Sequence, residues 1–308
     1  MGTKTMKMRD NMSGQQLESP QAETDLSSDL CHLSSDYKRH GGRATKKLSL
    51  AEKTGLASLA AGLGLGLVSP LYGAMPLAAF LLVSMGAPFL PSFSYYLEVI
   101  SRCPAGGPGI ALTFDDGPDP VSTPILLDLL ARYGFQATFF LIAEQAGRYP
   151  DLVREIVDRG HTIGNHSLRH DNLLMLRSYG KLRADIQESQ AVFAALGVRP
   201  LVFRPPVGIT NHSLGHVLRQ EGLIAVNYSC RAFDRGNRQI DHLAGRILSR
   251  LAPGDIVMLH DQPPHGRSTS LSQWQSELAS LFSALRFRYP VIALESCLEQ
   301  PVMERLQG

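Results

Sequence analysis

The feature that most constrains the fold is a regular alternation of short apolar stretches with helical patterns from residue 110 onward. Strands separated by helices are typical of a parallel sheet, because each helix returns the chain to the start of the next strand. The expected strands are residues 110–114, 137–142, 161–164, 201–203, 223–227, 255–259 and 291–294. The expected helices are residues 123–133, 151–159, 178–196, 213–221, 240–251 and 271–285.

Residues with catalytic chemistry follow several of these strands directly. Asp115 and Asp116 come after the first strand and precede a Gly-Pro turn. Two adjacent carboxylates are costly to ionise together unless a cation compensates them. Downstream, His166 and His170 are four residues apart, which places them on one face of a helical turn and within reach of one ion.

Two further motifs stand at later strand ends. Arg204 begins an Arg-Pro-Pro-x-Gly turn, and His260 and Asp261 follow the strand 255–259. Each motif alone has an ordinary explanation, such as a turn or a surface histidine pair. Four of them in order at strand ends favour an active site at the C-terminal edge of a parallel barrel.

With these motifs the chain resembles the polysaccharide deacetylases, also called the NodB-homology family or carbohydrate esterase family 4. The motifs read Thr-Phe-Asp-Asp-Gly-Pro, His-Ser-x-x-His, Arg-Pro-Pro-x-Gly and Leu-His-Asp, and the resemblance covers residues 109–298. It implies an α/β fold, a distorted (β/α)7 barrel that agrees with the seven expected strands. It also implies a metal-dependent hydrolase that removes an N-acyl group, expected to be acetyl, from an amino sugar.

The resemblance gives the motif residues roles. Asp116, His166 and His170 would hold a divalent metal, and this nitrogen and oxygen ligand set suits Zn²⁺ and also accepts Co²⁺ or Ni²⁺. Asp115 would be the general base, and Arg204 would pair with it and keep it ionised.

Three more residues complete the implied catalytic apparatus. His260 would be the general acid that protonates the leaving amine, and Asp234 would tune this histidine. The backbone N–H of Val207 would donate to the oxyanion, at a position where family members often carry Tyr.

The departures from the family pattern gather around the acyl pocket. Where the family often shows Asp-x-x-Asp-Trp, Arg231 replaces the first acid and Arg235 replaces the Trp. Met258 stands where Leu commonly lines the acyl pocket, and we assign it with Pro206, Arg231 and Arg235 to substrate binding. The two arginines would suit a phosphate-bearing or other anionic substrate; alternatively, they pair with Asp234 and other acids.

The N-terminal part has a different composition. Residues 1–47 are polar and are expected to form a disordered tail, and the apolar stretch starts too late for a signal peptide. In the segment 48–100, no residue from Thr54 to Leu97 is charged. This length favours two short membrane-inserted helices over one span or a buried soluble hairpin, and Gly62 and Gly66 would let the helices pack closely. Residues 101–108 are expected to be a linker and residues 299–308 a C-terminal tail.

The flanks of the apolar segment predict its orientation. Only Arg102 follows it closely, while basic residues cluster before it at Lys38, Arg39, Arg43, Lys46, Lys47 and Lys53. The positive-inside rule then places the N-terminus in the cytoplasm, in a bacterial inner membrane. One span would export the catalytic domain and a hairpin would return it, so the membrane face stays open. An anchor beside the domain favours a membrane-bound, lipid-linked or cell-envelope glycan as substrate.

The composition of the chain bears on which kinds of molecule it could bind. A net charge of +2 with 19% charged residues gives no reason to expect nucleic-acid binding, and no obligatory protein partner is evident. The four widely spaced cysteines form neither a disulfide framework nor a zinc knuckle, and they leave the redox compartment undecided. Two other functions stay open: a deformylase or non-sugar amidase with the same site, and an inactive glycan-binding scaffold, which should have lost a ligand, the base or the acid.

Overall fold

The structure is a computed structural model of the chain, and it describes residues 2, 48–90, 92–104, 107, 109–266 and 269–306. The chain divides into two units, Met1–Gly42 and Arg43–Gly308, and every helix and strand given below belongs to the second. Apart from Gly2, the expected disordered tail lies outside the described residues.

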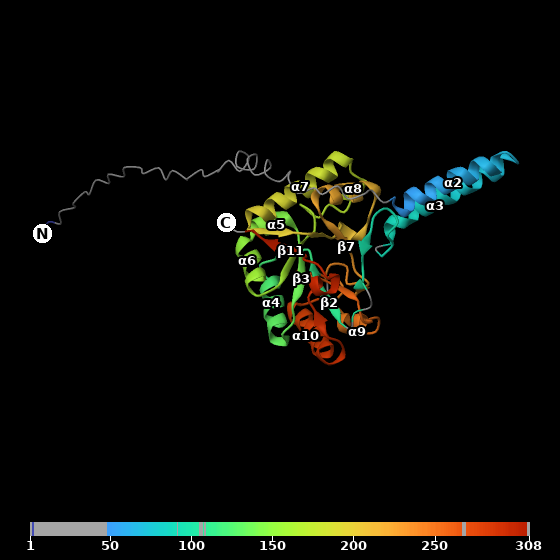
Figure 1. The fold of residues 1–308 in the computed structure, drawn as a ribbon. Coiled ribbons are helices and arrows are strands. Elements are labelled where there is room, and N and C mark those ends of the chain that lie inside the picture. The colour runs from blue at the N-terminus through green and yellow to red at the C-terminus, as the bar shows by residue number, and fades with distance from the viewer. Residues whose placement is uncertain are drawn as a thin grey trace. The chain divides into compact units, whose positions relative to one another are not determined.

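A nine-stranded sheet forms the centre of the second unit (Figure 1). Its main path runs β1-β7-β6-β4-β3-β2-β9-β8, with β10 paired to β2, and every ladder is parallel. All seven expected strands are present, whereas β1 and β8 were not foreseen. The strands are β1 Val99–Ile100, β2 Ile110–Asp115, β3 Ala137–Leu141, β4 Thr162–Asn165, β6 Val202–Phe203, β7 Ile224–Val226, β8 Cys230–Arg231, β9 Ile256–His260 and β10 Val291–Ile292.

The expected distorted barrel is confirmed, with an interruption at one point. Strands β7 and β8 follow each other in the chain, yet β7 pairs with β6 and β1 while β8 pairs with β9. Among the described residues no ladder joins the end strands β1 and β8, so the barrel is open at this point, and residues 227–229 connect β7 to β8. We call these three residues the seam.

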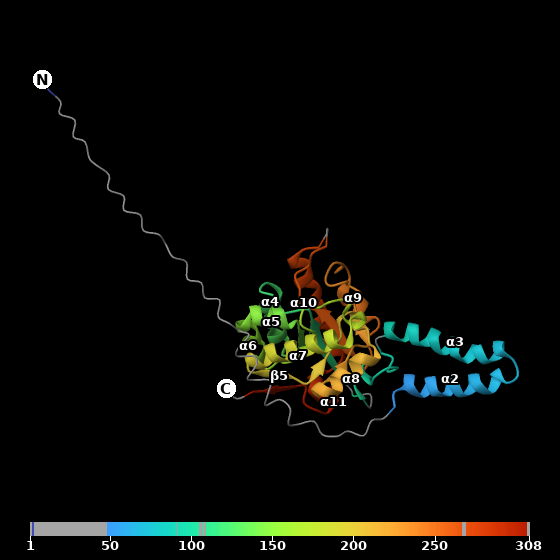
Figure 2. The same cartoon turned by 90° about the horizontal axis from the view of Figure 1, so that it is seen from above.

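Helices surround the strands in both views (Figures 1 and 2). The six expected helices are present and two short ones, α5 and α11, were not foreseen. The helices around the sheet are α4 Ser122–Tyr133, α5 Ala143–Arg148, α6 Pro150–Asp158, α7 Tyr179–Ala195, α8 His212–Glu221, α9 Leu243–Leu248, α10 Leu271–Arg288 and α11 Leu294–Leu298. Their apolar faces pack on the sheet; Trp274 of α10 and Phe114 of β2 are both fully buried in this core.

Two apolar helices precede the barrel, α2 Leu50–Gly66 and α3 Pro70–Gly86, and they lie side by side (Figures 1 and 2). Their backbones approach closely: a Cβ added to Gly73 would lie 2.8 Å from the carbonyl oxygen of Gly62 and from Cα of Gly66. The close packing expected from Gly62 and Gly66 is thus present. Most of their large apolar side chains are exposed, among them Leu63 and Leu82, so the rest of the described chain does not bury this hairpin.

Among the described residues, Pro70–Phe89 is the one helical stretch long and apolar enough, by length and composition, to cross a membrane. It comprises α3 and the short 3₁₀ helix η2 Ala87–Phe89. Tyrosines close the open end of the hairpin: the Tyr95 hydroxyl contacts Thr54 and Ser84, and the Tyr96 hydroxyl donates to the Ser84 carbonyl oxygen at 2.6 Å.

Three boundaries differ from expectation. Strand β1 lies within the segment 48–100 but belongs to the sheet. The expected linker contains Cys103, which forms a disulfide with Cys297 of α11, and the cysteine spacing had not indicated this pair. The expected tail 299–308 contains β11 Met303–Arg305, which pairs antiparallel with β5 Val198–Pro200.

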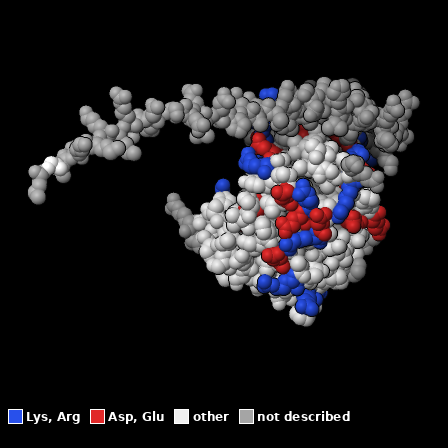
Figure 3. Space-filling view, turned by 90° about the vertical axis from the view of Figure 1, so that its left-hand side faces the viewer, with Lys and Arg blue, Asp and Glu red and all other residues white. Residues whose placement is uncertain are grey.

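Charges of both signs are interspersed on the side of the molecule that carries α6 (Figure 3). Ion pairs explain this mixture, because Arg159 bonds Asp128 at 2.8 Å and Glu155 at 2.7 Å, and Arg154 bonds Asp151 at 2.8 Å. This face therefore presents no field of a single sign.

Candidate active site

Asp116, His166 and His170 converge at the C-terminal ends of β2 and β4. The Nε2 atoms of His166 and His170 lie 3.4 and 3.3 Å from Oδ1 of Asp116. One ligand atom from each residue lies within 4.8 Å of the others, which is the spacing that a single metal ion requires. No other group of three such side chains with this spacing occurs among the described residues.

The donor atoms fit a divalent cation. Oδ1 of Asp116 is buried, and no hydrogen bond satisfies it within the described part of the chain; a buried unsatisfied oxygen is costly unless an ion binds it. Nδ1 of His166 is 2.7 Å from the Arg204 carbonyl oxygen, so Nδ1 carries the proton and Nε2 is left to coordinate. Burial alone would raise the pKa of Asp116, but its interactions with the imidazoles of His166, His260 and His170 hold it well below its usual range.

Local backbone geometry directs the Asp116 side chain to this point. Asp115 continues the β2 ladder opposite His260, whereas Asp116 has a positive φ of 77° and leaves the strand. The two adjacent carboxylates therefore separate. Gly117 follows against the Asp261 side chain, whose carboxylate would collide with any Cβ at this position; this close approach explains the glycine.

Arg204 holds Asp115 in a fully buried network. Its Nη1 donates to Oδ1 of Asp115 at 2.5 Å and to the Thr113 hydroxyl at 2.8 Å. Its Nε and Nη2 donate to the carbonyl oxygens of Val226 and Asn227. Oδ2 of Asp115 is left on the metal side, 4.0 Å from Nε2 of His166. The expected Asp115–Arg204 pair is thus formed, and Asp115 is outside the ligand cluster.

His260 and Asp234 form a second pair. Nδ1 of His260 is 2.9 Å from Oδ2 of Asp234, and Asp234 is almost fully buried. Burial on its own would lower the pKa of His260, but Asp234, with the charges of Asp116 and Asp115, raises it to about 9. His260 is therefore held as a proton donor near neutral pH.

The remaining predicted residues occupy different places. Val207, at φ 53°, lies in the 3₁₀ turn η5 Pro206–Gly208 directly after Arg204 and Pro205. Met258 is buried in β9 and pairs in register with Arg231 of β8. Arg235 is exposed. In the described residues the Asp234 carboxylate pairs with His260, and no ion pair joins it to Arg231 or Arg235. The expectation that these two arginines pair with Asp234 is therefore wrong.

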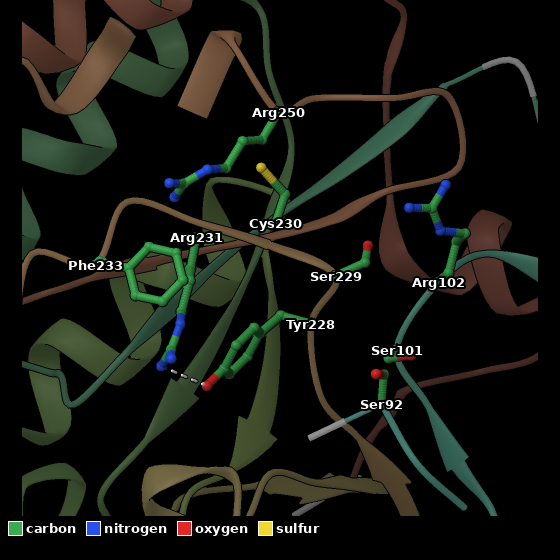
Figure 4. Close-up of a pocket in the computed structure, with 9 residues that line it drawn as sticks. All are labelled: Ser92, Ser101, Arg102, Tyr228, Ser229, Cys230, Arg231, Phe233 and Arg250. Carbon is green, nitrogen blue, oxygen red and sulfur yellow. Dashed lines mark hydrogen bonds between the residues drawn. The ribbon is translucent and has the colours of Figure 1, made fainter. Parts of the chain in front are cut away.

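Two cavities adjoin this region. One, of about 400 Å³, includes Asp116 and is walled by residues around α5 and the loop after β9. The other, of about 510 Å³, lies at the seam and contains none of the metal cluster. We call the second the seam pocket; Figure 4 shows the residues that line it, which are Ser92, Ser101, Arg102, Tyr228, Ser229, Cys230, Arg231, Phe233 and Arg250.

Sequence reasoning gave no role to several residues that support the site. The carboxylate of Asp261 accepts hydrogen bonds from Ser122 at 2.7 Å and Thr123 at 2.6 Å, which ties the strand end after His260 to α4. The Asn165 side chain accepts from the Ser167 N–H at 2.8 Å and shapes the turn between the histidines. The Leu-His-Asp motif could have indicated a role for Asp261, whereas the roles of Ser122, Thr123 and Asn165 become visible only in the fold.

Comparison with known proteins decides the family. A polysaccharide deacetylase profile matches residues 103–226. A peptidoglycan-N-acetylglucosamine deacetylase of Bacillus cereus is 38% identical over 154 residues, which are 49% of this chain and 72% of that protein. The chain belongs to the polysaccharide deacetylase family.

Other members of the polysaccharide deacetylase family give the same result. A chitooligosaccharide deacetylase of Sinorhizobium fredii is 33% identical over 194 residues, 62% of this chain and 89% of that protein. The crystal structure of the Bc1960 peptidoglycan N-acetylglucosamine deacetylase matches with a TM-score of 0.60 and 27% identity, over 66% of this chain and 94% of that one. The chitin deacetylase of Colletotrichum lindemuthianum matches with a TM-score of 0.56 and 26% identity, over 66% and 92%.

Proposed function

We propose that this protein is a metal-dependent deacetylase that removes the N-acetyl group from an amino sugar of a membrane-bound, lipid-linked or cell-envelope glycan. The observation that carries the proposal is the convergence of one three-residue cluster and two pairs at one edge of the barrel. They are the Asp116–His166–His170 cluster, the Asp115–Arg204 pair and the His260–Asp234 pair. An inactive scaffold would have lost one of them.

The chain's own residues divide the reaction between them. A divalent metal held by Asp116, His166 and His170, with Zn²⁺ our first choice, would polarise the acyl carbonyl and lower the pKa of a water. Asp115 takes the proton from that water, because Arg204 fixes one of its oxygens and leaves the other directed at the site.

The acid side of the mechanism follows from the second pair. With Nδ1 engaged by Asp234, His260 presents Nε2 to the leaving amine and donates a proton to it. The backbone N–H of Val207 donates to the oxyanion that forms when the carbonyl is attacked. This donor belongs to the main chain, so the replacement of the family's Tyr leaves it in place. Pro206 and Met258 are proposed to contact the substrate beside these groups.

The apolar hairpin supports a substrate at a membrane. Its large side chains are exposed along both helices, and burying such a surface in lipid is strongly favourable. An active site joined closely to such a hairpin would work on glycan near the bilayer surface.

The test is acetate release from N-acetylglucosamine oligomers by the full chain in detergent, after metal removal and after reloading with Zn²⁺ or Co²⁺. We expect release only with metal, and a loss of about 100- to 10,000-fold in Asp115→Asn. Asp158→Asn, an exposed aspartate of α6, is the matched control. Release that survives both metal removal and Asp115→Asn would refute the proposal.

One observation supports testing a formyl group as an alternative to the acetyl group. Arg235, which stands at the position of the family's pocket Trp, is exposed and does not close the acyl pocket. Formylated and acetylated amino-sugar substrates assayed side by side distinguish a deformylase from a deacetylase. A preference for formyl that Met258→Leu does not alter would favour the deformylase.

A further inference from the structure

We propose that the seam pocket binds a phosphate ester carried by the amino-sugar substrate. The inference rests on the proposed function, since it names a chemical group of that substrate. The residues that carry it lie outside the metal cluster and the two catalytic pairs, so the two ideas can fail separately.

The pocket holds two arginines whose charge is not balanced. The guanidinium carbons of Arg231 and Arg250 lie 4.2 and 4.8 Å from the centre of the Phe233 ring, and Phe233 as a whole residue is 49% exposed. Figure 4 shows both side chains beside the ring. Neither arginine forms an ion pair in the part of the chain that the structure describes. Two like charges held near one ring repel each other, and a bound anion would remove that cost.

The other ionisable groups of the pocket leave this positive charge intact. Arg102 is balanced by Asp255, at 2.7 Å, so this pair contributes no net charge. Burial raises the pKa of the Cys230 thiol to about 11, and burial also raises the pKa of Tyr228 above its usual value. Both groups are therefore neutral at physiological pH, and neither repels an anion.

The chemistry of the pocket favours phosphate. A guanidinium presents a planar fork of donors that matches phosphate oxygens in pairs, and two such forks can share one dianion. The hydroxyl of Tyr228 accepts from Nη1 of Arg231 at 3.1 Å, which leaves its own proton available for a phosphate oxygen. At about 510 Å³ the cavity has room for a phosphate together with part of the group attached to it.

The pocket also lies near the base of the apolar hairpin, where the phosphate of a membrane lipid would be located if the hairpin is inserted in a membrane. Ser92, one of its lining residues, comes shortly after the apolar hairpin and beside Phe93, Tyr95 and Tyr96, which cluster at the hairpin's base. Aromatic rings next to an apolar membrane segment are typical of the level of lipid headgroups. Phosphates of lipid-linked sugars lie at this same level.

A contact chain links the pocket to the reacting centre. Arg231 bonds Tyr228, and the Tyr228 ring lies 5.8 Å from the guanidinium carbon of Arg204, which holds the base Asp115. Arg231 also pairs in register with Met258, the residue proposed for the acyl pocket. Tyr228 therefore lies between the seam pocket and the Asp115–Arg204 pair, and the proposal requires the sugar attached to the phosphate to extend past this ring to the metal cluster.

The first test is binding without catalysis. Calorimetry measures the affinity of the full chain in detergent for inorganic phosphate, with Arg231→Gln, Arg250→Gln and the exposed Arg183→Gln of α7 as matched control. We expect each pocket variant to weaken binding by about tenfold and the control to leave it unchanged. Equal phosphate affinity in wild type and in both pocket variants overturns the proposal, whether or not the protein is an active deacetylase.

A second test identifies the source of the phosphate. Flotation with phosphatidylcholine vesicles, with and without phosphatidic acid, measures whether a lipid phosphate engages the same arginines. The rate at which the N-acetyl group is removed from N-acetylglucosamine 1-phosphate is compared with the rate for a neutral N-acetylglucosamine oligomer. A ratio of kcat/KM that favours the phosphorylated sugar in wild type and falls in Arg231→Gln and Arg250→Gln supports the proposal. Deacetylation of both substrates with a ratio unchanged by the variants overturns it and leaves the proposed function standing.

Discussion

Replacing Arg204 with methionine tests how the buried network around the base is built. The guanidinium is fully buried and donates to Asp115, Thr113 and two main-chain carbonyl oxygens. Its guanidinium carbon also lies 3.9 Å from the centre of the Phe140 ring. Methionine fills a similar length but offers no donor, so the Asp115 carboxylate would be left buried without its cation.

The expected cost is large. Removing one partner of a buried ion pair destabilises a protein by about 3–5 kcal/mol, and three other oxygens lose a donor here as well. We therefore expect Arg204→Met to lower the free energy of unfolding by about 4–5 kcal/mol. Asp115→Asn in the same chain removes the stranded charge, so the double variant should be more stable than Arg204→Met alone.

The chain provides its own reporter. Trp274 is the single tryptophan and is fully buried in the core between α10 and the sheet, so its fluorescence in urea follows unfolding of the barrel and not of the hairpin. Arg183→Met, on the exposed side of α7, is the control and should change stability by less than about 0.5 kcal/mol. A loss below about 1 kcal/mol in Arg204→Met, or a double variant less stable than Arg204→Met, would refute the reasoning.

Three further outcomes follow from single residues. Gly117→Ala forces a Cβ into the Asp261 carboxylate, and we expect a loss of about 1–3 kcal/mol in urea unfolding; an unchanged midpoint would mean that Asp261 moves freely. His170→Ala should weaken Zn²⁺ binding by more than about a hundredfold in calorimetry, whereas His216→Ala on α8 should not; equal affinities would remove His170 from the metal site. Burial, with Arg159 nearby, lowers the pKa of His161 to about 4, so the unfolded state binds its proton first and stability is lost as pH falls from 6.5 to about 4. His161→Gln should abolish up to about 3 kcal/mol of that loss, and parallel pH dependence of the two proteins in urea would contradict the assignment.

The sequence predicted the elements whose pattern is local. Residues 110–114 are apolar except for Thr113, and residues 256–259 within the predicted strand 255–259 are all apolar; such runs identify buried strands. The polar residues directly after them lie at the same edge of the sheet because parallel strands align their C-terminal ends. This is why Asp115, Asp116 and His260, far apart in the chain, could be assigned to one site.

Elements that depend on distant partners could not be predicted. Strand β8 has two residues, too few to show any periodicity, and exists because it pairs with β9. Strand β11 is mostly exposed, and only its partner β5 defines it. The surroundings of Arg231 were missed for the same reason: its sequence neighbours suggested an acid as partner, whereas the fold places Tyr228 and Phe233 against it.

The Cys103–Cys297 disulfide predicts on which side of a membrane the catalytic domain would lie if the apolar hairpin is inserted as proposed. Disulfides persist in oxidising compartments and are rare in the bacterial cytosol, so this bond favours a catalytic domain that lies outside the cytosol. Helices α2 and α3 pack side by side as a hairpin, and a hairpin returns the chain to the face from which it entered. The disulfide and the hairpin together predict that the N-terminus lies on the same oxidising side of the membrane as the catalytic domain. The basic residues before the hairpin indicate the opposite, a cytoplasmic N-terminus. A thiol-reactive reagent that cannot cross membranes, applied to intact cells, would distinguish the two orientations by whether it labels Cys31, which precedes the hairpin in the sequence.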